Sequence, residues 1–395
     1  MTDPLGQSQV LPYLCGLAKL GYQFTLLSFE KKDKFERLRP VIEKITAEAG
    51  IKWVPLFFTK KPPVLAKLYD LYQMRKTAAA LHRQYGFDLI HCRSYIPVSS
   101  VLNLCKKARI PYLFDMRGFW VDERVDNGQW DLSNPFYKMA YRHYKKKEKV
   151  YFRQAAHVIS LTETGRQELI NKYAVAPEKI TVIPCCADLT LFDYHHVSEN
   201  RKAALREELG IPSDKKVISY LGSLGGWYLT DEMLAFYSNL RKANPEYIFL
   251  FITHNRKEEI MRKAAALHIP EEAIVVKPAD RKEVPEVLSL SDWSIFFIKD
   301  AYSKKASSPT KQGEIMAMGI PLVCNNIGDT GAIVSAAKAG IVIRQFDESH
   351  YKEAVHEMLN SVPPDPRPVR QAAFQHYDLQ YGIKRYAAVY QTLIP

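Results

Sequence analysis

Short runs of apolar and β-branched residues alternate with longer amphipathic stretches along all 395 residues of the chain. This alternation is typical of parallel sheets whose faces are covered by helices. The expected strands are Gln23–Phe29, Trp53–Phe57, Leu89–Cys92, Tyr112–Asp115, His157–Ser160, Thr181–Pro184, Val217–Leu221, Tyr247–Ile252, Ala273–Val276, Trp293–Ile298, Pro321–Cys324 and Gly340–Ile343. The polar stretch Ala187–Ser213 has no strand pattern and separates the first six from the last six. The sequence therefore predicts two α/β units side by side.

The beginning of the chain departs from this pattern. Met1–Gln7 has the composition of a loop that leads into an amphipathic helix over Ser8–Leu20. In a doubly wound unit a strand should precede such a loop. The first unit is therefore expected to lack its opening strand.

Composition excludes several classes of protein. Hydrophobic residues make up 47% of the chain and charged residues 25%, and no apolar run is long enough to span a membrane. There is no secretory signal pattern, and the six cysteines lack C-x-x-C spacing. Signatures of metalloproteases, serine hydrolases, P-loop enzymes and nucleic-acid-binding modules are absent. A reduced, cytoplasmic protein without a metal site or a nucleic-acid partner fits best.

The net charge of +12 is unevenly distributed. Residues 1–185 contain 30 Lys and Arg against 17 Asp and Glu, whereas residues 186–395 contain 25 against 26. Such an asymmetry favours a basic face that meets an anionic partner, either a phospholipid surface or a phosphate-bearing substrate. A basic face that serves only solubility is the alternative.

Two segments of the second half could bind an anion. Val217–Leu221 is a strand that runs into the glycine-rich turn Gly222–Gly226, where backbone N–H groups can approach a phosphate, although a plain tight turn has the same pattern. Further on, Ser308 is expected to cap a short helix that has Pro309 in its first turn. Lys311 and Glu314 then lie one turn apart, either as ligand-binding residues or as a solvated ion pair.

The pattern P-T-K-x-G-E-x-x-A-x-G-I-P-L-V over residues 309–323 resembles the donor-site helix of GT-B glycosyltransferases, especially those of family 4. Pro4–Gln9 is similar to the glycine loop before the family's first helix. Ile183–Asp188, followed by Phe192, is similar to its linker motif, and Gly222–Gly226 to its phosphate loop. The resemblance therefore extends over nearly the whole chain.

This resemblance implies two Rossmann-like, doubly wound domains that face a cleft. Residues 1–188 would bind the acceptor and residues 189–376 the nucleotide-sugar donor, while a helix at about 377–395 packs back on the first domain. The implied donor-binding residues are Gly222, Ser223 and Lys311 for the diphosphate, Glu314 for the ribose, the backbone of Lys277 and Ala279 for the base, and Gly6, Gly225 and Thr310 elsewhere in the donor site. No cofactor or metal is implied.

The chain departs from the family pattern at two places. Ala306 stands where many members have a first glutamate, eight residues before Glu314. Around the phosphate loop, where members often have Arg and Lys, this chain has Ser223, Leu224, Trp227 and Tyr228. A diphosphate still requires positive charge, so Lys311 is the leading candidate, with Arg256 and Lys304 behind it.

In the first half, polar residues follow two expected strands. Asp115 and Arg117 lie in a segment that resembles a family loop contacting the transferred sugar, and with Glu314 they are the predicted catalytic residues. Arg93 follows the neighbouring strand and is predicted to bind the acceptor. Ligands of open α/β sheets bind at these carboxyl ends. Asp115 acting only as a structural cap is the alternative.

The segment Pro135–Arg153 predicts a basic helix that also carries tyrosines. Lys138, Arg142, Lys145 and Lys146 are predicted to face the acceptor or an anionic membrane. The alternative is a tyrosine stripe packed in the core beneath a solvated basic face.

These observations predict a glycosyltransferase that moves a sugar from a nucleoside diphosphate to a hydroxyl of a polysaccharide or lipid-linked acceptor, with retention of anomeric configuration. It would be cytoplasmic, either free or peripheral at the inner face of the membrane. Two alternatives remain open: a nucleotide-sugar 2-epimerase of the same fold, and a non-catalytic carbohydrate-binding or scaffold protein.

Overall fold

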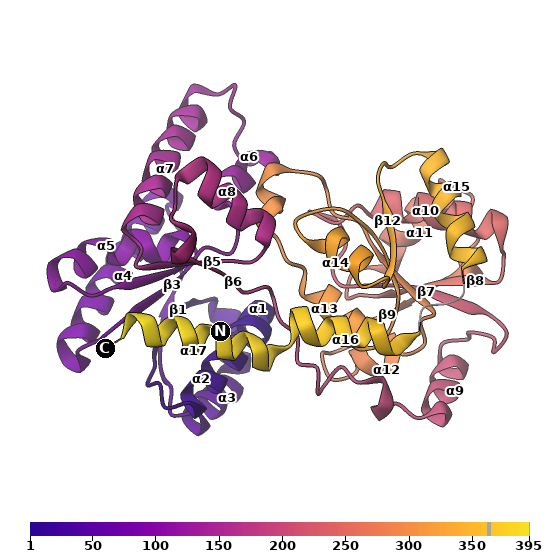
Figure 1. The fold of residues 1–395 in the computed structure, drawn as a ribbon, viewed down its shortest axis with the longest axis horizontal. Helices are drawn as coiled ribbons and strands as arrows, with labels where there is room; N and C mark the ends of the chain where they lie inside the picture. The colour runs from indigo at the N-terminus through magenta and orange to yellow at the C-terminus, as the bar shows by residue number, and fades with distance from the viewer. Residues whose placement is uncertain (362–364, 395) are drawn as a thin grey trace. The chain divides into compact units, whose positions relative to one another are not determined.

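The computed structural model describes residues 1–361 and 365–394, which divide into two compact units (Figure 1). Unit 1 comprises Met1–Cys186 together with the chain from Leu379 onward, and unit 2 comprises Ala187–Asp378. Both junctions lie within two residues of the expected boundaries. Residues 362–364 of the expected donor domain and residue 395 of the expected last helix lie outside the described residues.

All twelve expected strands are present in the described part of the chain, with ends that differ from the expected ones by at most two residues. They are β1 (Thr25–Glu30), β2 (Lys52–Phe57), β3 (Ile90–Arg93), β4 (Tyr112–Asp115), β5 (His157–Ser160), β6 (Ile180–Val182), β7 (Lys216–Leu221), β8 (Tyr247–Ile252), β9 (Ile274–Lys277), β10 (Trp293–Phe296), β11 (Leu322–Asn325) and β12 (Gly340–Ile343). Every pairing between neighbouring strands is parallel.

Unit 2 contains one six-stranded sheet in the order β12-β11-β10-β7-β8-β9. All six residues of β8 are buried, as expected for a parallel strand that is covered on both faces. The strand order is that of a doubly wound Rossmann-like sheet. Its helices are α9 (Glu199–Glu208), α10 (Thr230–Ala243), α11 (Lys257–Ala265), α12 (Val284–Leu288), α13 (Thr310–Ala317), α14 (Thr330–Ala336), α15 (Glu348–Asn360) and α16 (Pro366–Tyr377), with short 3-10 turns η2 (Tyr194–His196), η3 (Glu271–Ala273) and η4 (Tyr302–Ala306).

Unit 1 has two parallel sheets, β1-β2 and β3-β4-β5-β6. In a doubly wound sheet the first strand joins the second strand to the fourth. No strand precedes the first helix among residues 1–24, so the two sheets stay separate. Helices of this unit are α1 (Pro4–Gln9), α2 (Leu11–Lys19), α3 (Lys32–Glu48), α4 (Pro63–Tyr85), α5 (Tyr95–Ala108), α6 (Trp120–Asp126), α7 (Pro135–Gln154), α8 (Glu163–Tyr173) and α17 (Leu379–Leu393), with the 3-10 turn η1 (Pro177–Lys179).

The N-terminal segment corrects the expected loop. Pro4, whose ring pre-sets a helical φ, begins α1, so Gly6 lies inside a helix and not in a glycine loop. The helix breaks at Val10, with φ of −126° and ψ of −63°, because Pro12 lacks the N–H that would continue it. One expected helix is therefore two short ones.

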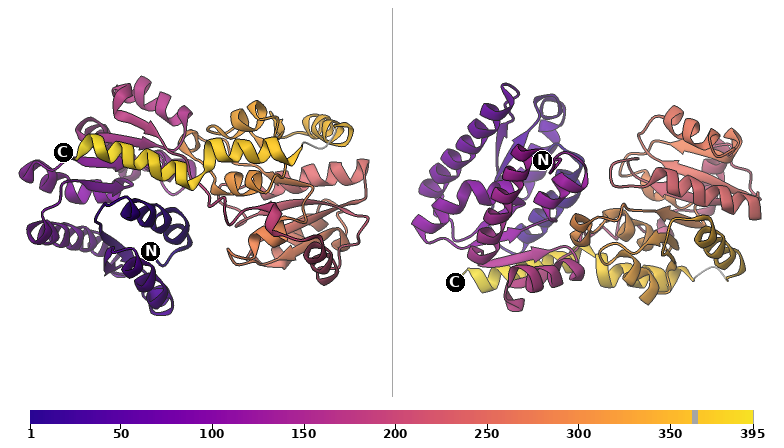
Figure 2. Two further views of the ribbon diagram at one scale, coloured as in Figure 1. Left: turned by 60° about the horizontal axis from the view of Figure 1, so that its bottom comes forward. Right: turned by 90° about the horizontal axis from the view of Figure 1, so that it is seen from above.

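The helix α17 belongs to unit 1, although unit 2 separates it from the rest of that unit in sequence. In Figure 2 it runs against the purple helices and strands of unit 1. Tyr386 packs edge-on against Tyr13 of α2, with ring centroids 5.5 Å apart. Leu17 and Ile383 are buried in the same apolar cluster. This packing brings tyrosines of α17 to the carboxyl ends of β3 and β4.

Candidate functional site

The helix α13 carries the first group of candidate residues in unit 2. Pro309, with ψ of 121°, takes the N-cap position, so the helix begins at Thr310, one residue later than the expected start with Ser308 as cap. Lys311 is 8% exposed and Glu314 is 7% exposed. This burial excludes the alternative of a solvated ion pair.

The ammonium group of Lys311 lies among aromatic rings. Its Nζ is 4.3 Å from the ring centroid of Tyr220 and 3.5 Å from that of Tyr228, and it donates a hydrogen bond of 3.2 Å to the Tyr220 hydroxyl. Burial lowers the pKa of Lys311 from 10.5 to about 7, while the neighbouring Glu314 raises it. Cation–π contacts compensate for only part of the lost hydration. The site thus holds a cation that an anionic ligand would stabilise.

The glycine turn after β7 lies directly against this lysine. A Cβ on Gly222, where φ is 117°, would lie 2.8 Å from Lys311 Nζ. The N–H groups of Leu224 and Gly225 donate to Asn255 and Thr230. Within the described residues, the backbone N–H groups of Ser223 and Gly226 donate to no partner, and both residues are exposed. The turn therefore presents two backbone N–H donors and lies against one buried ammonium group.

A second lysine is stacked on the loop that follows. Lys304 of η4 is buried, and its Nζ lies 3.8 Å from the ring centroid of Trp227. Trp227 and Tyr228 lie in the loop after the glycine turn, and their rings contact Lys304 of η4 and Lys311 of α13 respectively. The positive charge of this region therefore comes from η4 and α13 and not from the loop itself. Arg256 is the N-cap residue of α11, and within the described residues no hydrogen bond joins it to these lysines or rings.

Glu314 has a partner that the sequence did not indicate. Its Oε1 accepts a hydrogen bond of 2.8 Å from Arg281, whose guanidinium also lies 5.5 Å from the ring centroid of Phe192. Arg281 follows the segment Lys277–Ala279 predicted to bind the base. The Lys277 side chain pairs with Glu208, and the carbonyl of Ala279, which is buried, accepts from His254. The carboxylate of Glu314 is thus held in place by an arginine that lies two residues after the segment predicted to bind the base.

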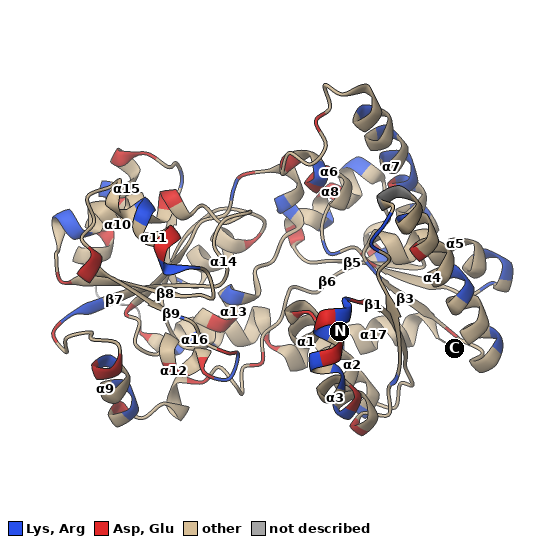
Figure 3. Ribbon diagram, turned by 180° about the vertical axis from the view of Figure 1, so that it is seen from behind, with Lys and Arg blue, Asp and Glu red and all other residues tan. Residues whose placement is uncertain are grey.

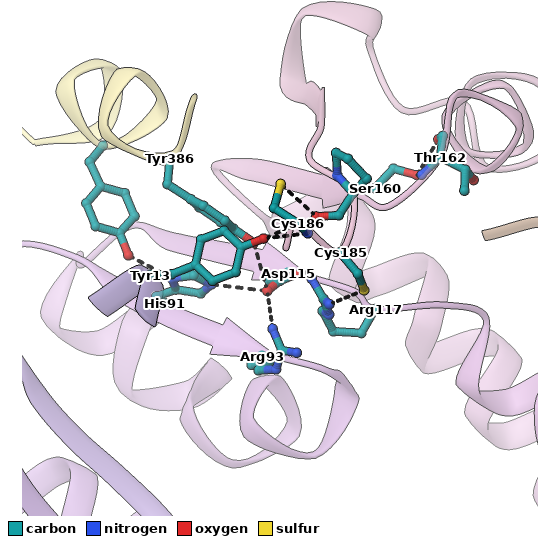
Figure 4. A network of polar contacts seen from close by, with 12 residues as sticks. Tyr13, His91, Arg93, Asp115, Arg117, Ser160, Thr162, Cys185, Cys186 and Tyr386 are labelled. Carbon is teal, nitrogen blue, oxygen red and sulfur yellow. Dashed lines mark hydrogen bonds and ion pairs between the residues drawn. The ribbon is translucent and has the colours of Figure 1, made fainter. Parts of the chain in front are cut away.

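The second group of candidates lies in unit 1, at the ends of β3 and β4 (Figure 4). Asp115 is 1% exposed, and its Oδ2 accepts from Arg93 at 3.2 Å and from the Tyr386 hydroxyl at 3.1 Å. Arg117 Nη1 lies 3.6 Å from Oδ1, and His91 Nε2 lies 3.6 Å from Oδ2. Burial raises the pKa of Asp115, but Arg117, His91 and Arg93 together hold it well below its ordinary value of 3.8.

The structure corrects the predicted role of one residue of the basic helix α7. Lys145 contacts Asp122, Glu148 and the Tyr173 hydroxyl, and its side chain is only 15% exposed. It is therefore an internal ion-pair partner and does not face a surface ligand. The tyrosines of α7 also pack inward: Tyr141 donates to Asp122, and Tyr151 is buried. Lys138, Arg142 and Lys146 are exposed, and Figure 3 shows the basic residues along α7.

Several of these residues had no local signal in the sequence. Arg281 and Tyr386 lie 33 and 271 residues from their carboxylate partners, Glu314 and Asp115. Tyr228 was noted only as a departure from the family pattern. The position of His91 two residues before Arg93 was the one available indication, because alternate residues of a strand face the same side. Gly6, which the resemblance implied as a donor-site residue, lies in α1 and packs against Met1.

Comparison with known proteins shows the family to which the chain belongs. A model of Glycosyltransferase Family 4 matches residues 8–191, and a model of Glycosyl transferases group 1 matches residues 201–375. The chain belongs to the GT-B glycosyltransferases of this family.

Individual relatives are distant. A D-inositol 3-phosphate glycosyltransferase of Stackebrandtia nassauensis is 21% identical over 287 residues, which cover 70% of this chain and 61% of that protein. The chain thus spans less than two thirds of that relative's length. Among solved structures, a Rickettsia africae glycosyltransferase has a TM-score of 0.71 at 15% identity, covering 99% and 96% of the two chains. Anabaena HepE, solved with UDP and glucose, has a TM-score of 0.67 at 14% identity, covering 98% of each chain. At such identities the structures establish the fold.

Proposed function

We propose that the protein transfers a sugar from a nucleoside diphosphate to a hydroxyl group of a glycan or lipid-linked acceptor. The observation that carries this proposal is the grouping of Gly222, Lys311 and Glu314 at the carboxyl end of β7. A glycine turn, a buried cation and a buried carboxylate one helical turn apart match the diphosphate and ribose of such a donor. The two HepE ligands, UDP and glucose, are consistent with this donor class.

In this proposal the diphosphate lies on the glycine turn. The N–H groups of Ser223 and Gly226 donate to its oxygens, and the Lys311 ammonium supplies charge where family members place an Arg and a Lys. Glu314, held by Arg281, accepts hydrogen bonds from the ribose hydroxyls, and backbone groups of Lys277–Ala279 read the base. The positive groups stabilise the charge that develops on the leaving diphosphate, without a metal or a cofactor.

Reaction would require the acceptor hydroxyl to be held at the anomeric carbon, on the face that the diphosphate leaves. Holding two reactants in position lowers the barrier by replacing a bimolecular encounter with an arranged one. Asp115 and Arg117 are the proposed contacts to the reacting sugar. Family membership supports retention of anomeric configuration.

Calorimetric titration with UDP tests the donor site, and product analysis tests the reaction. Purified protein should bind UDP, and incubation with a UDP-sugar and acceptor should release UDP with a mass gain on the acceptor. Conversion of the sugar nucleotide without an acceptor would instead identify an epimerase. Absence of both nucleotide binding and turnover would leave the scaffold alternative.

We also propose that unit 1 meets an anionic membrane through α4. Leu65, Leu68, Tyr69 and Tyr72 are each more than half exposed, and their spacing of three and four residues places them on one helical face. The nearby Lys60, Lys61 and Lys67 are exposed as well. An apolar stripe flanked by cations favours insertion at an anionic interface. None of the helices within residues 1–361 and 365–394 has the length and apolarity of a membrane span.

A further inference from the structure

The cluster around Asp115 carries more positive charge than its own contacts neutralise. Two guanidinium groups, Arg93 and Arg117, surround one carboxylate. Each guanidinium has five N–H donors. In the described chain Arg93 uses one of them, toward Asp115, and Arg117 uses one, toward Cys185 Sγ at 3.0 Å. Most of the donors therefore remain available to a ligand, and one excess positive charge remains in the cluster.

The backbone around the cluster is held in conformations that side chains rarely adopt. Ser94, directly after Arg93, has φ of 72°, and Arg117 itself has φ of 60°. The Ser94 N–H donates to the Asp115 carbonyl at 2.7 Å, which ties the two strand ends together. Such strain costs of order 1 kcal/mol or more per residue and is concentrated at functional sites. The loops thus place both arginines beside the same carboxylate at a strain cost.

We propose that Arg93 and Arg117 bind a phosphate group of the acceptor, so that the acceptor of this enzyme is a phosphate ester. Asp115 keeps the two guanidinium groups in register, and the phosphate neutralises the excess charge with bidentate hydrogen bonds. Arg93 provides access for this group, since its side chain is 31% exposed, whereas that of Arg117 is 13% exposed. The inference rests on the proposed transfer reaction, because it names the acceptor class for it.

The diphosphate of the donor does not require this cluster, whose contacts to the donor are limited to the proposed ones with the reacting sugar. In unit 2 the glycine turn and Lys311 already supply backbone donors and a cation for a diphosphate. A second set of phosphate-binding groups in unit 1 therefore corresponds to a second anionic group. The excess of cations in residues 1–185 would also attract such an acceptor.

The test is titration of the full chain with inorganic phosphate in the presence of saturating UDP, which fills the donor site. The wild-type protein should bind phosphate, and Arg93→Gln should weaken that binding at least about tenfold, as expected for losing a charge-assisted contact. Arg93→Lys should give an intermediate affinity, because lysine keeps the positive charge but cannot form the bidentate hydrogen bonds of a guanidinium group. Arg37→Gln, which removes an exposed arginine of α3, is the matched control and should bind like wild type.

Two further titrations separate the sources of the phosphate. Glycerol 3-phosphate represents a small phosphate ester, and a polyprenyl phosphate in detergent represents a lipid-linked one. At least one of them should compete with inorganic phosphate, and the stronger competitor identifies the acceptor type. Absence of phosphate binding to the UDP-saturated protein, or wild-type phosphate affinity in Arg93→Gln, overturns the proposal. A loss of UDP affinity in Arg93→Gln also overturns it, by assigning the cluster to the donor. If UDP itself does not bind, the proposed function fails at unit 2.

Discussion

The ammonium nitrogen of Lys311 lies 3.5 Å from the centre of the Tyr228 ring, in the loop that follows the glycine turn. The positive charge beside the glycine turn therefore lies against an aromatic side chain of the loop. The aromatic ring holds a lysine that comes from α13. An aromatic ring stabilises a cation less than a carboxylate does, so we expect an anionic ligand to stabilise the charged form of Lys311 further.

Binding of UDP should be accompanied by proton uptake above neutral pH. With a pKa of about 7, Lys311 is mostly neutral at pH 8.5 in the free protein, and a bound diphosphate favours its charged form. Titrations in HEPES and in Tris, whose ionisation enthalpies differ, should report close to one proton taken up. Affinity should fall by up to about tenfold per pH unit above pH 7.

The matched variant for this experiment is Lys311→Arg, which stays charged and should bind UDP without proton uptake. The free protein offers a second readout. Since the unfolded lysine titrates near 10.5 and the folded one near 7, wild-type stability should rise relative to Lys311→Met between these pH values. Equal proton uptake by wild type and Lys311→Arg would contradict the assignment.

Gly222→Ala should weaken the free energy of UDP binding by more than it lowers the free energy of unfolding. A Cβ at this position would crowd Lys311 Nζ and add a side chain at φ of 117°. Gly210→Ala is the control, because Gly210 has φ of 65° with no atom near its Cβ position. Both substitutions should cost about 1 kcal/mol of stability. Only Gly222→Ala should weaken UDP binding in calorimetry; equal UDP affinities in the two variants would remove the turn from the donor site.

Glu314→Gln should lower UDP affinity at least about tenfold while the thermal midpoint changes little. The amide keeps the shape of the side chain but loses the negative charge, which strengthens the hydrogen bonds that the carboxylate accepts from Arg281 and, in the proposed complex, from the ribose hydroxyls. The partly exposed Arg281 can be hydrated when its partner is lost, so the fold should persist. Glu348→Gln on α15, an exposed carboxylate, should leave UDP binding unchanged. Wild-type affinity in Glu314→Gln would sink the ribose assignment.

Asp115→Asn should destabilise unit 1, by about 3 kcal/mol or less because Arg93 is partly exposed. The folded pKa of Asp115 is depressed, so its contribution is present above 3.8 and is lost as pH falls below that value. The difference in thermal midpoint between wild type and variant should therefore shrink under acid conditions. Asp88→Asn, at an exposed residue before β3, serves as the control. A pH-independent difference would mean that Asp115 acts through packing alone.

Replacing Leu68 and Tyr72 with serine should weaken binding to vesicles that contain phosphatidylglycerol. Both side chains lie on the exposed stripe of α4. Wild-type protein should sediment with these vesicles in a salt-dependent way and less with neutral phosphatidylcholine vesicles. Val41→Ser, at an exposed valine of α3, controls for general loss of apolar surface. Equal sedimentation of the double variant and wild type would exclude α4 as the contact.

The sequence predicted the strands well because parallel strands are continuous apolar runs between helices, and β4, β5, β8 and β12 match their expected ranges. It failed at Pro4–Gln9, where the glycine suggested a loop but Pro4 begins a helix. For the candidate site, the proposed roles of Lys311, Glu314 and Asp115 rest on their residue types, their spacing and the resemblance, and they stay predictions. Arg281 and Tyr386 were not predictable, since their partners are distant in sequence and only tertiary packing joins them.

The hydrogen bond between Tyr386 and Asp115 spans 271 residues of chain. During translation at about 5–20 residues per second, strands β3 and β4 leave the ribosome long before α17 does. Unit 2 is synthesised entirely in between. Asp115 and its two arginines therefore lack the Tyr386 hydrogen bond until α17 has been synthesised and has packed on unit 1. A nascent chain that ends after unit 2 would contain all the residues of the proposed donor site and still lack the finished cluster of unit 1, so the two groups of residues are completed at different times.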